Sequence, residues 1–162
     1  MAHDVRPYSR GVIGGTFDVL HVGHKKLIST GLAKVGTLYI GVTSDHLANL
    51  SKDHEITPFE KRVDRLVRFV RELGAPERVK IVKIEDPFGP TVEDPSLEVI
   101  LVTEAVLNNT FRMNEIRGER GMKKLDIMVL PFVKAEDGGI VSSTRIRQGV
   151  IDGQRIDPSH AK

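Results

Sequence analysis

The stretch GGTFDVLHVGH, from Gly14 to His24, decides the fold that this sequence predicts. A short apolar run over residues 11–13 precedes it and is typical of a buried strand. An amphipathic run over residues 25–35 follows it and predicts a helix. A strand that passes through glycine into a helix presents backbone N–H groups to an anion, so this stretch predicts a phosphate site. His21, on the same helical face as His24, adds a second side-chain donor there.

Length and charge place the chain among ordinary globular proteins. Its 162 residues are enough for one domain with a sizeable core and are few for two. The 24 basic and 22 acidic residues leave a formal net charge of +2, too balanced for nucleic acid or an anionic membrane as the main partner. We therefore predict a single domain over residues 1–162, with its core at about 10–152 and polar tails at both ends.

Cysteine is absent, which excludes disulfides, thiolate metal sites and cysteine nucleophiles. Residues 1–10 are polar and lack the apolar centre of a signal peptide. No apolar run approaches the roughly 20 residues that span a bilayer. We expect a cytoplasmic protein with no membrane partner and no nucleic-acid partner.

Strand and helix patterns alternate along the chain. Apolar, β-branched runs predict strands at about 10–14, 37–43, 79–84, 99–102 and 126–130. Helical spacing predicts helices at about 22–35, 46–50, 57–73, 104–120 and from 142. Thr57 and Glu60 have the spacing of a capping box at one helix start. The alternation predicts an α/β fold in which helices cover both faces of a parallel five-stranded sheet. Ligands of such sheets bind at the carboxyl ends of the strands.

A second candidate phosphate site lies late in the chain. Ser142, Ser143 and Thr144 precede the last predicted helix, where hydroxyl groups are ordinary N-caps. Arg145 and Arg147 follow in the first turns, where the helix dipole favours acidic residues instead. Hydroxyl, guanidinium and free N–H groups at one helix start favour binding of a polyphosphate.

Other candidates are weaker when taken alone. Lys52 lies in a polar loop, where most lysines are simply solvated. Asn114 and Arg117 are three residues apart on a predicted helix, so both could point into one cleft. Arg62 lies at the ligand-side end of its helix. The histidine pair could also bind zinc. The spacing of the two histidines differs from the usual four residues, however, and no third ligand follows, so we predict no protein-held metal.

The order of the two motifs resembles the nucleotidyltransferase superfamily, which has an HxGH signature and a Rossmann-like fold. Gly14–His24 is similar to its first motif, and the Ser-Ser-Thr-x-x-Arg pattern over 142–147 is similar to its last. Further segments resemble the archaeal and eukaryotic branch of pantetheine-phosphate adenylyltransferase: residues 41–45, 58–62, 86–91 and 114–117. The resemblance extends over about 10–152.

The resemblance implies transfer of an adenylyl group from ATP to 4′-phosphopantetheine, giving dephospho-coenzyme A and pyrophosphate in coenzyme A biosynthesis. His24 would donate to the α-phosphate, with His21 binding the phosphates beside it. Lys52 and Thr16 would bind the phosphate of the acceptor. The remaining ATP contacts would come from Gly15, Thr16, Phe17, Ser142, Ser143, Thr144 and Arg147, and Mg²⁺ would be held mainly by ATP and water.

One family feature is missing, and other activities stay open. Bacterial members have Gly-Leu-Arg after the fourth strand, where this chain has Val102-Thr103-Glu104, so Asn114 and Arg117 are candidate replacements in substrate binding. Related alternatives are a glycerol-phosphate cytidylyltransferase or an FMN or NMN adenylyltransferase. A different class is a non-catalytic sensor of nucleotide or coenzyme A. For the enzyme, the expected partners are ATP, 4′-phosphopantetheine, dephospho-coenzyme A and coenzyme A.

Overall fold

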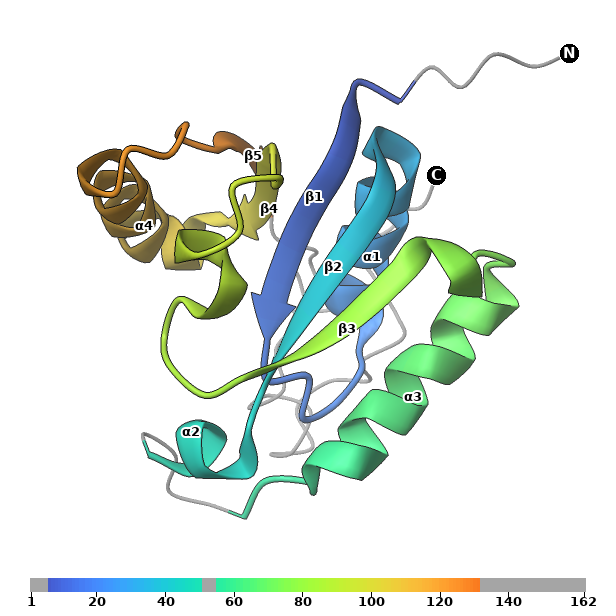
Figure 1. Cartoon of the computed structure of the whole chain (residues 1–162). Helices are drawn as coiled ribbons and strands as arrows, with labels where there is room; N and C mark the ends of the chain where they lie inside the picture. Colours follow the sequence, from blue (N-terminus) through green and yellow to red (C-terminus); the bar gives the residue numbers. More distant parts are fainter. Residues whose placement is uncertain (1–5, 51–54, 132–162) are drawn as a thin grey trace, which may run out of the picture.

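A parallel β-sheet forms the centre of the computed structural model, which describes residues 6–50 and 55–131 (Figure 1). Its strands are β1 (Tyr8–Gly15), β2 (Val35–Thr43), β3 (Val79–Ile84), β4 (Val99–Thr103) and β5 (Asp126–Leu130). They lie in the order β3-β2-β1-β4-β5, and every pairing is parallel. The chain leaves β1 toward β2 and β3, then returns to place β4 on the other side of β1. This switch point is where open α/β sheets bind ligands.

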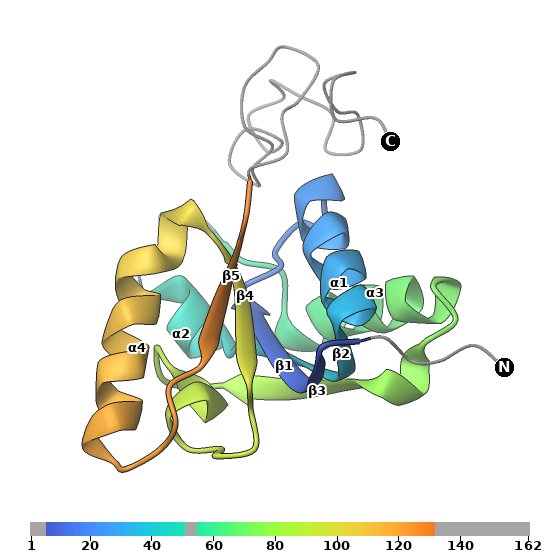
Figure 2. The same cartoon turned by 90° about the horizontal axis from the view of Figure 1, so that it is seen from above.

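Helices cover both faces of the sheet, which confirms the predicted fold class (Figures 1 and 2). The helices are α1 (Val22–Lys34), α2 (Asp45–Asn49), α3 (Phe59–Glu72) and α4 (Leu107–Glu119), with single 3₁₀ turns at Pro76–Arg78, Gly89–Val92 and Glu104–Val106. Among the residues that the structure describes, no helix is long and apolar enough to cross a membrane.

Adjacent residues of β1 serve two separate cores. Ile13 packs in the core shared with α1 and α3, whereas Val12 packs in the core shared with α4. Successive strand residues point to opposite faces, so a strand buried on both sides reads as a continuous apolar run. This explains why β1 shows no polar alternation in the sequence at residues 11–13.

The start of α3 differs from the sequence prediction. The predicted capping box of Thr57 and Glu60 is wrong. The backbone N–H of Thr57, which would donate to Glu60 in such a box, donates to Asp18 Oδ1 at 2.8 Å instead. The helix begins at Phe59, whose backbone N–H donates to Asp45 Oδ1 at 2.9 Å. A tertiary contact therefore uses the residue that the local pattern assigned to the cap. The last predicted helix, from residue 142, lies outside the described residues.

Candidate active site

A cavity of about 820 Å³ opens at the carboxyl ends of β1, β2 and β4. The loop that joins β1 to α1 lines one end, and this loop contains the predicted phosphate stretch. Other lining residues come from the loop before β4 and from α4. The residues that matter below are Thr16, Phe17, His21, His24, Lys26, Thr43, Pro87, Phe88, Pro90, Thr91, Asn109, Thr110 and Met113. The cavity thus lies where the sequence predicted a ligand site.

The two histidines cap the first turn of α1. His21 is the N-cap residue, and its Nδ1 accepts hydrogen bonds from the backbone N–H groups of Gly23 (3.1 Å) and His24 (3.4 Å). The Nδ1 of His24 in turn accepts from the backbone N–H of His21 at 3.3 Å. Since each Nδ1 is an acceptor, a neutral ring at either position has its proton on Nε2. The helix start therefore fixes both tautomers.

Burial keeps both imidazoles neutral at neutral pH. Desolvation lowers the pKa of His21 to about 4. Desolvation, together with repulsion from His21, lowers the pKa of His24 to about 3, and a hydrogen bond to the Val19 backbone acts in the opposite direction. The rings stack with their centroids 3.7 Å apart. The pair offers neutral N–H donors beside the helix N-terminus, rather than charged imidazolium groups.

The turn between β1 and α1 depends on a residue that is not glycine. Phe17 has a φ of 54°, and its ring lies 4.9 Å from that of His24, with only 2% of its surface exposed. Gly14 and Gly15 both belong to β1, so the turn follows the glycine pair. A side chain in this left-handed region costs about 1–3 kcal/mol. The site stores that strain where Phe17 supports the His24 ring.

Gly23 has a role other than leaving room for a ligand. A Cβ atom at this position would lie 2.9 Å from Cε1 and 3.1 Å from Nδ1 of His21. The absent side chain therefore lets the His21 ring fold back onto the helix start. A larger residue between the two histidines would displace the His21 ring from this position.

A buried arginine joins the loops around the cavity. Arg62 is 0% exposed. It donates to the carbonyl oxygens of Thr57 (2.7 Å), Thr16 (2.9 Å) and Thr43 (2.8 Å) and forms a 2.8 Å ion pair with Asp45. The expectation that Arg62 lies at the ligand-side end of its helix is correct. The side chain is absent from the cavity lining, so its contact with the site is through the backbone of the threonines.

Asn114 and Arg117 do not point into the cavity, which corrects the sequence expectation. The Asn114 amide donates to the carbonyl of Leu125 at 2.9 Å and accepts from its backbone N–H at 2.8 Å. Arg117 is 0% exposed and donates to the carbonyls of Thr91 and Asp94 in the loop before β4 and to that of Lys123 after α4. The α4 residues that do line the cavity are Asn109, Thr110 and Met113. Asn114 directly follows Met113 but its amide binds Leu125 instead, and Arg117 lies four residues beyond Met113.

Lysine 26 was missed by the sequence analysis. Lys26 lies in the second turn of α1, is exposed and lines the cavity beside the histidines. The signal was present, because α1 has no acidic residue in its first turn. A basic residue near a helix N-terminus is unfavourable for the helix dipole, so Lys26, like Arg145 and Arg147, indicates a bound anion. Those arginines, Lys52 and the hydroxyls at 142–144 lie outside the described residues.

Comparisons with known proteins agree with this geometry. A model of the "Cytidylyltransferase-like" family matches residues 12–149. A phosphopantetheine adenylyltransferase from Methanopyrus kandleri is 41% identical over 146 residues, covering 90% of this chain and 93% of its own. One from Methanosarcina barkeri is 42% identical over 143 residues, covering 86% and 87%.

The chain belongs to the cytidylyltransferase-like family, in its phosphopantetheine adenylyltransferase branch. The resemblance inferred from the motif order is confirmed. A crystal structure of a protein of unknown function from Archaeoglobus fulgidus matches this member with a TM-score of 0.66 and 34% identity, over 75% of this chain and 88% of that one. A tyrosyl-tRNA synthetase from the same organism matches with a TM-score of 0.60 and 14% identity over 92% of this chain and 61% of its own, which shows a shared fold alone.

Within residues 6–50 and 55–131, this family member has no cluster of three or more His, Cys, Asp or Glu side chains that could hold a metal ion. Among the described residues, the titratable groups lining the cavity are Asp18, His21, His24 and Lys26. Asp18 is buried, and its carboxylate accepts from the Thr57 backbone, which indicates a structural role for this side chain. The described part of the site is built to donate hydrogen bonds to an anion.

Proposed function

We propose that this protein transfers the adenylyl group of ATP to 4′-phosphopantetheine, giving dephospho-coenzyme A and pyrophosphate. The observation that carries the proposal is the pair of neutral, mutually capped imidazoles at the start of α1, facing the cavity. The family and the curated relatives named for this activity support the choice of substrates.

The reaction needs alignment and charge stabilisation rather than an acid or a base. An oxygen of the acceptor phosphate, ionised at neutral pH, attacks the α-phosphorus of ATP. The bond from that phosphorus to the bridging oxygen breaks, and the electron pair leaves with pyrophosphate. His24 donates through Nε2 to the α-phosphate as its charge grows, exchanging its contact with the Val19 backbone for the substrate. The α1 N-terminus and His21 stabilise the neighbouring oxygens.

The remaining contacts with the two substrates are assigned from the positions of the residues and from the resemblance to the family. Gly15, Thr16 and Phe17 lie at the carboxyl end of β1, where backbone groups approach the phosphates. Lys52 would bind the acceptor phosphate, and Ser142, Ser143, Thr144 and Arg147 would bind the β- and γ-phosphates. ATP enters as its Mg²⁺ complex, with the ion held by the triphosphate and water, as suits a site whose described lining has one carboxylate. We place this reaction in the cytoplasm, a compartment compatible with a chain without cysteine.

A pyrophosphate-release assay tests the proposal. ATP and CTP are each offered with 4′-phosphopantetheine, glycerol phosphate, FMN and NMN. We expect turnover with ATP and 4′-phosphopantetheine; turnover only with another pair would replace this substrate assignment. Binding of ATP or coenzyme A without turnover would favour a sensor.

His24→Ala should lower kcat more than tenfold, as loss of a transition-state donor does. The control is His46→Ala, an exposed histidine of α2 that does not line the cavity. Equal kcat values for the two variants would remove His24 from the mechanism.

A further inference from the structure

The loop over residues 86–95, called here the 86–95 loop, forms one wall of the cavity together with α4. Pro87, Phe88, Pro90 and Thr91 of the loop line the cavity. Its conformation is held by internal hydrogen bonds: Asp86 Oδ1 accepts from the backbone N–H groups of Phe88 (3.0 Å) and Gly89 (2.8 Å). Such a loop is ordered within itself, but its position relative to α4 needs separate contacts.

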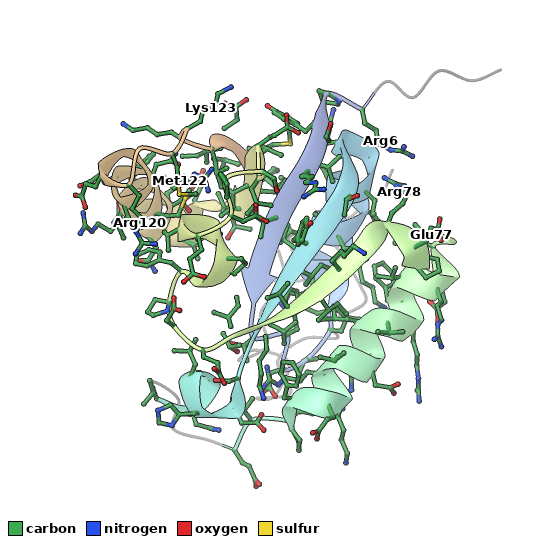
Figure 3. The ribbon with its side chains drawn as sticks, viewed as in Figure 1. Arg6, Glu77, Arg78, Arg120, Met122 and Lys123 are labelled. Atoms are coloured by element: carbon green, nitrogen blue, oxygen red, sulfur yellow. The ribbon has the colours of Figure 1, made fainter. Side chains whose placement is uncertain are left out.

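Arg117 supplies those contacts from the last turns of α4. Its Nη1 donates to the carbonyls of Thr91 (2.7 Å) and Asp94 (3.0 Å), and its Nε donates to the carbonyl of Lys123 at 2.7 Å. Arg120 adds a bond from its Nη1 to the carbonyl of Val92 at 2.7 Å. Figure 3 shows Arg120, Met122 and Lys123 together around the end of α4. Arg117 of α4 and Arg120, the C-cap residue of α4, thus bind three backbone carbonyls of one loop.

The burial of this cation is costly, and its hydrogen bonding is incomplete. Arg117 is 0% exposed, its direct partners are carbonyl oxygens, and its Nη2 has no hydrogen-bond partner among the described residues. Apolar side chains around it, among them Val92 and Met113, already pack the loop against α4. Apolar contacts are non-directional, whereas a guanidinium fixes the positions of the carbonyls that it binds. Stability alone is therefore a weak reason to bury this group.

We propose that Arg117 is a positioning residue that fixes the 86–95 loop on α4, and that the resulting wall sets the fit of the acceptor's uncharged chain. The inference rests on the proposed function. Within the described part of the chain, the titratable side chains that line the cavity all belong to residues 18–26, while this wall presents Pro87, Phe88, Pro90 and Met113 with the amide of Asn109. The acceptor has a matching division, because its phosphate is followed by an uncharged chain with amide groups. Thr91 links Arg117 to the cavity, since Thr91 lines the cavity and its carbonyl accepts a hydrogen bond from Arg117.

The test compares the full-length wild type with Arg117→Lys, Arg117→Met and Arg120→Ala. Arg78→Lys is the matched control, because Arg78 also binds three backbone carbonyls, those of Gly36, Leu32 and Val35. It lies across the sheet, away from α4 (Figure 3). Steady-state kinetics give KM for each substrate, and hydrogen exchange reports the protection of the 86–95 loop.

We expect Arg117→Lys to raise KM for 4′-phosphopantetheine at least fivefold and to leave KM for ATP within twofold. Exchange in the 86–95 loop should become at least tenfold faster while that of β1 is unchanged. Arg117→Met should have the larger effect, because lysine retains the charge and part of the carbonyl contacts. Arg120→Ala should shift the same quantities less, and it keeps the test open if Arg117→Met does not fold.

Three results would overturn the inference. If Arg117→Lys is less stable but its KM values for ATP and 4′-phosphopantetheine equal those of the wild type, Arg117 has only a structural role. KM for ATP rising as much as that for the acceptor would also refute it, as would unchanged or uniformly faster exchange. A wild type that releases no pyrophosphate contradicts the proposed function instead, and loop exchange still decides whether Arg117 holds the loop.

Discussion

The imidazoles of His21 and His24 cap each other's backbone: His21 Nδ1 accepts from the N–H of His24, and His24 Nδ1 accepts from the N–H of His21. This is a capping box made of two histidines, in which a ring nitrogen replaces the usual hydroxyl and carboxylate. Protonation of either Nδ1 would turn an acceptor into a donor facing another donor. The cap, the helix start and the phosphate donors therefore depend on the same two neutral rings.

The first prediction is a loss of stability on mild acidification. The folded protein holds the histidine pKa values at about 4 and about 3, below the ordinary 6.5, so between pH 6.5 and 4 the unfolded chain binds more protons. Stability from this source is complete above pH 6.5, falls as the pH drops, and levels off once the folded rings protonate. Each histidine contributes a slope of at most about 1.4 kcal/mol per pH unit.

Urea unfolding at pH 7 and pH 4.5 measures this effect. The double variant His21→Asn/His24→Gln should flatten the pH dependence, because both replacements stay neutral and Asn is a good N-cap. His46→Asn, at an exposed position, is the control. An equally steep loss in the double variant would show that other groups cause it.

The second prediction concerns Gly23→Ala. The new Cβ would lie 2.9 Å from His21 Cε1, so the ring must move and its cap must weaken. We expect at least a tenfold loss of kcat as the donors are displaced. Gly118→Ala in α4 is the matched control, since its Cβ would meet only Lys124 Cε at 3.4 Å. That variant should stay active and gain up to about 1 kcal/mol in helix stability. Wild-type kcat in Gly23→Ala would separate the cap from catalysis.

The sequence predicted those parts of the site that follow one another along the chain. The strand, turn and helix around Gly14–His24 form the predicted order, and β5 spans Asp126–Leu130 as expected. Both rest on local signals, namely apolar periodicity and residues that stand three apart. Even there, the sequence does not reveal that Phe17 takes the left-handed conformation.

The burial of two arginines could not be predicted from the sequence. Arg62 shares α3 with several other basic residues, Arg117 shares α4 with Arg112, and most such helix side chains are solvated. What buries them is a set of backbone carbonyls from distant segments, such as Thr16 for Arg62 and Thr91 for Arg117. Carbonyl groups occur at every position and leave no mark in a sequence. Only the tertiary structure separates Arg117, a support of the wall, from the substrate ligand that it was predicted to be.

The third prediction is that Arg62→Met destabilises the fold and the site together. The variant leaves the carbonyls of Thr16, Thr43 and Thr57 without this donor, and removal of one partner from a buried charge network costs about 3 kcal/mol or more. Urea unfolding measures the loss. Arg68→Ala is the control, because Arg68 is 73% exposed and pairs with Asp64 on the surface, where such a pair contributes about 0.5 kcal/mol or less. Similar losses in the two variants would refute a central role for Arg62.

The fourth prediction assigns Lys26 to phosphate binding. Its side chain lines the cavity two residues beyond His24, on the helix end that favours anions. Lys26→Gln should raise KM for ATP roughly threefold to tenfold, equivalent to about 0.7–1.4 kcal/mol, because an exposed charge contributes modestly to binding. The difference from wild type should shrink as salt is raised, since salt screens exposed charges. Lys34→Gln, in the last turn of the same helix and outside the cavity lining, is the control. If the two variants have the same KM for ATP at low salt, Lys26 does not contact the nucleotide, and the cation at this end of the site must come from elsewhere in the chain.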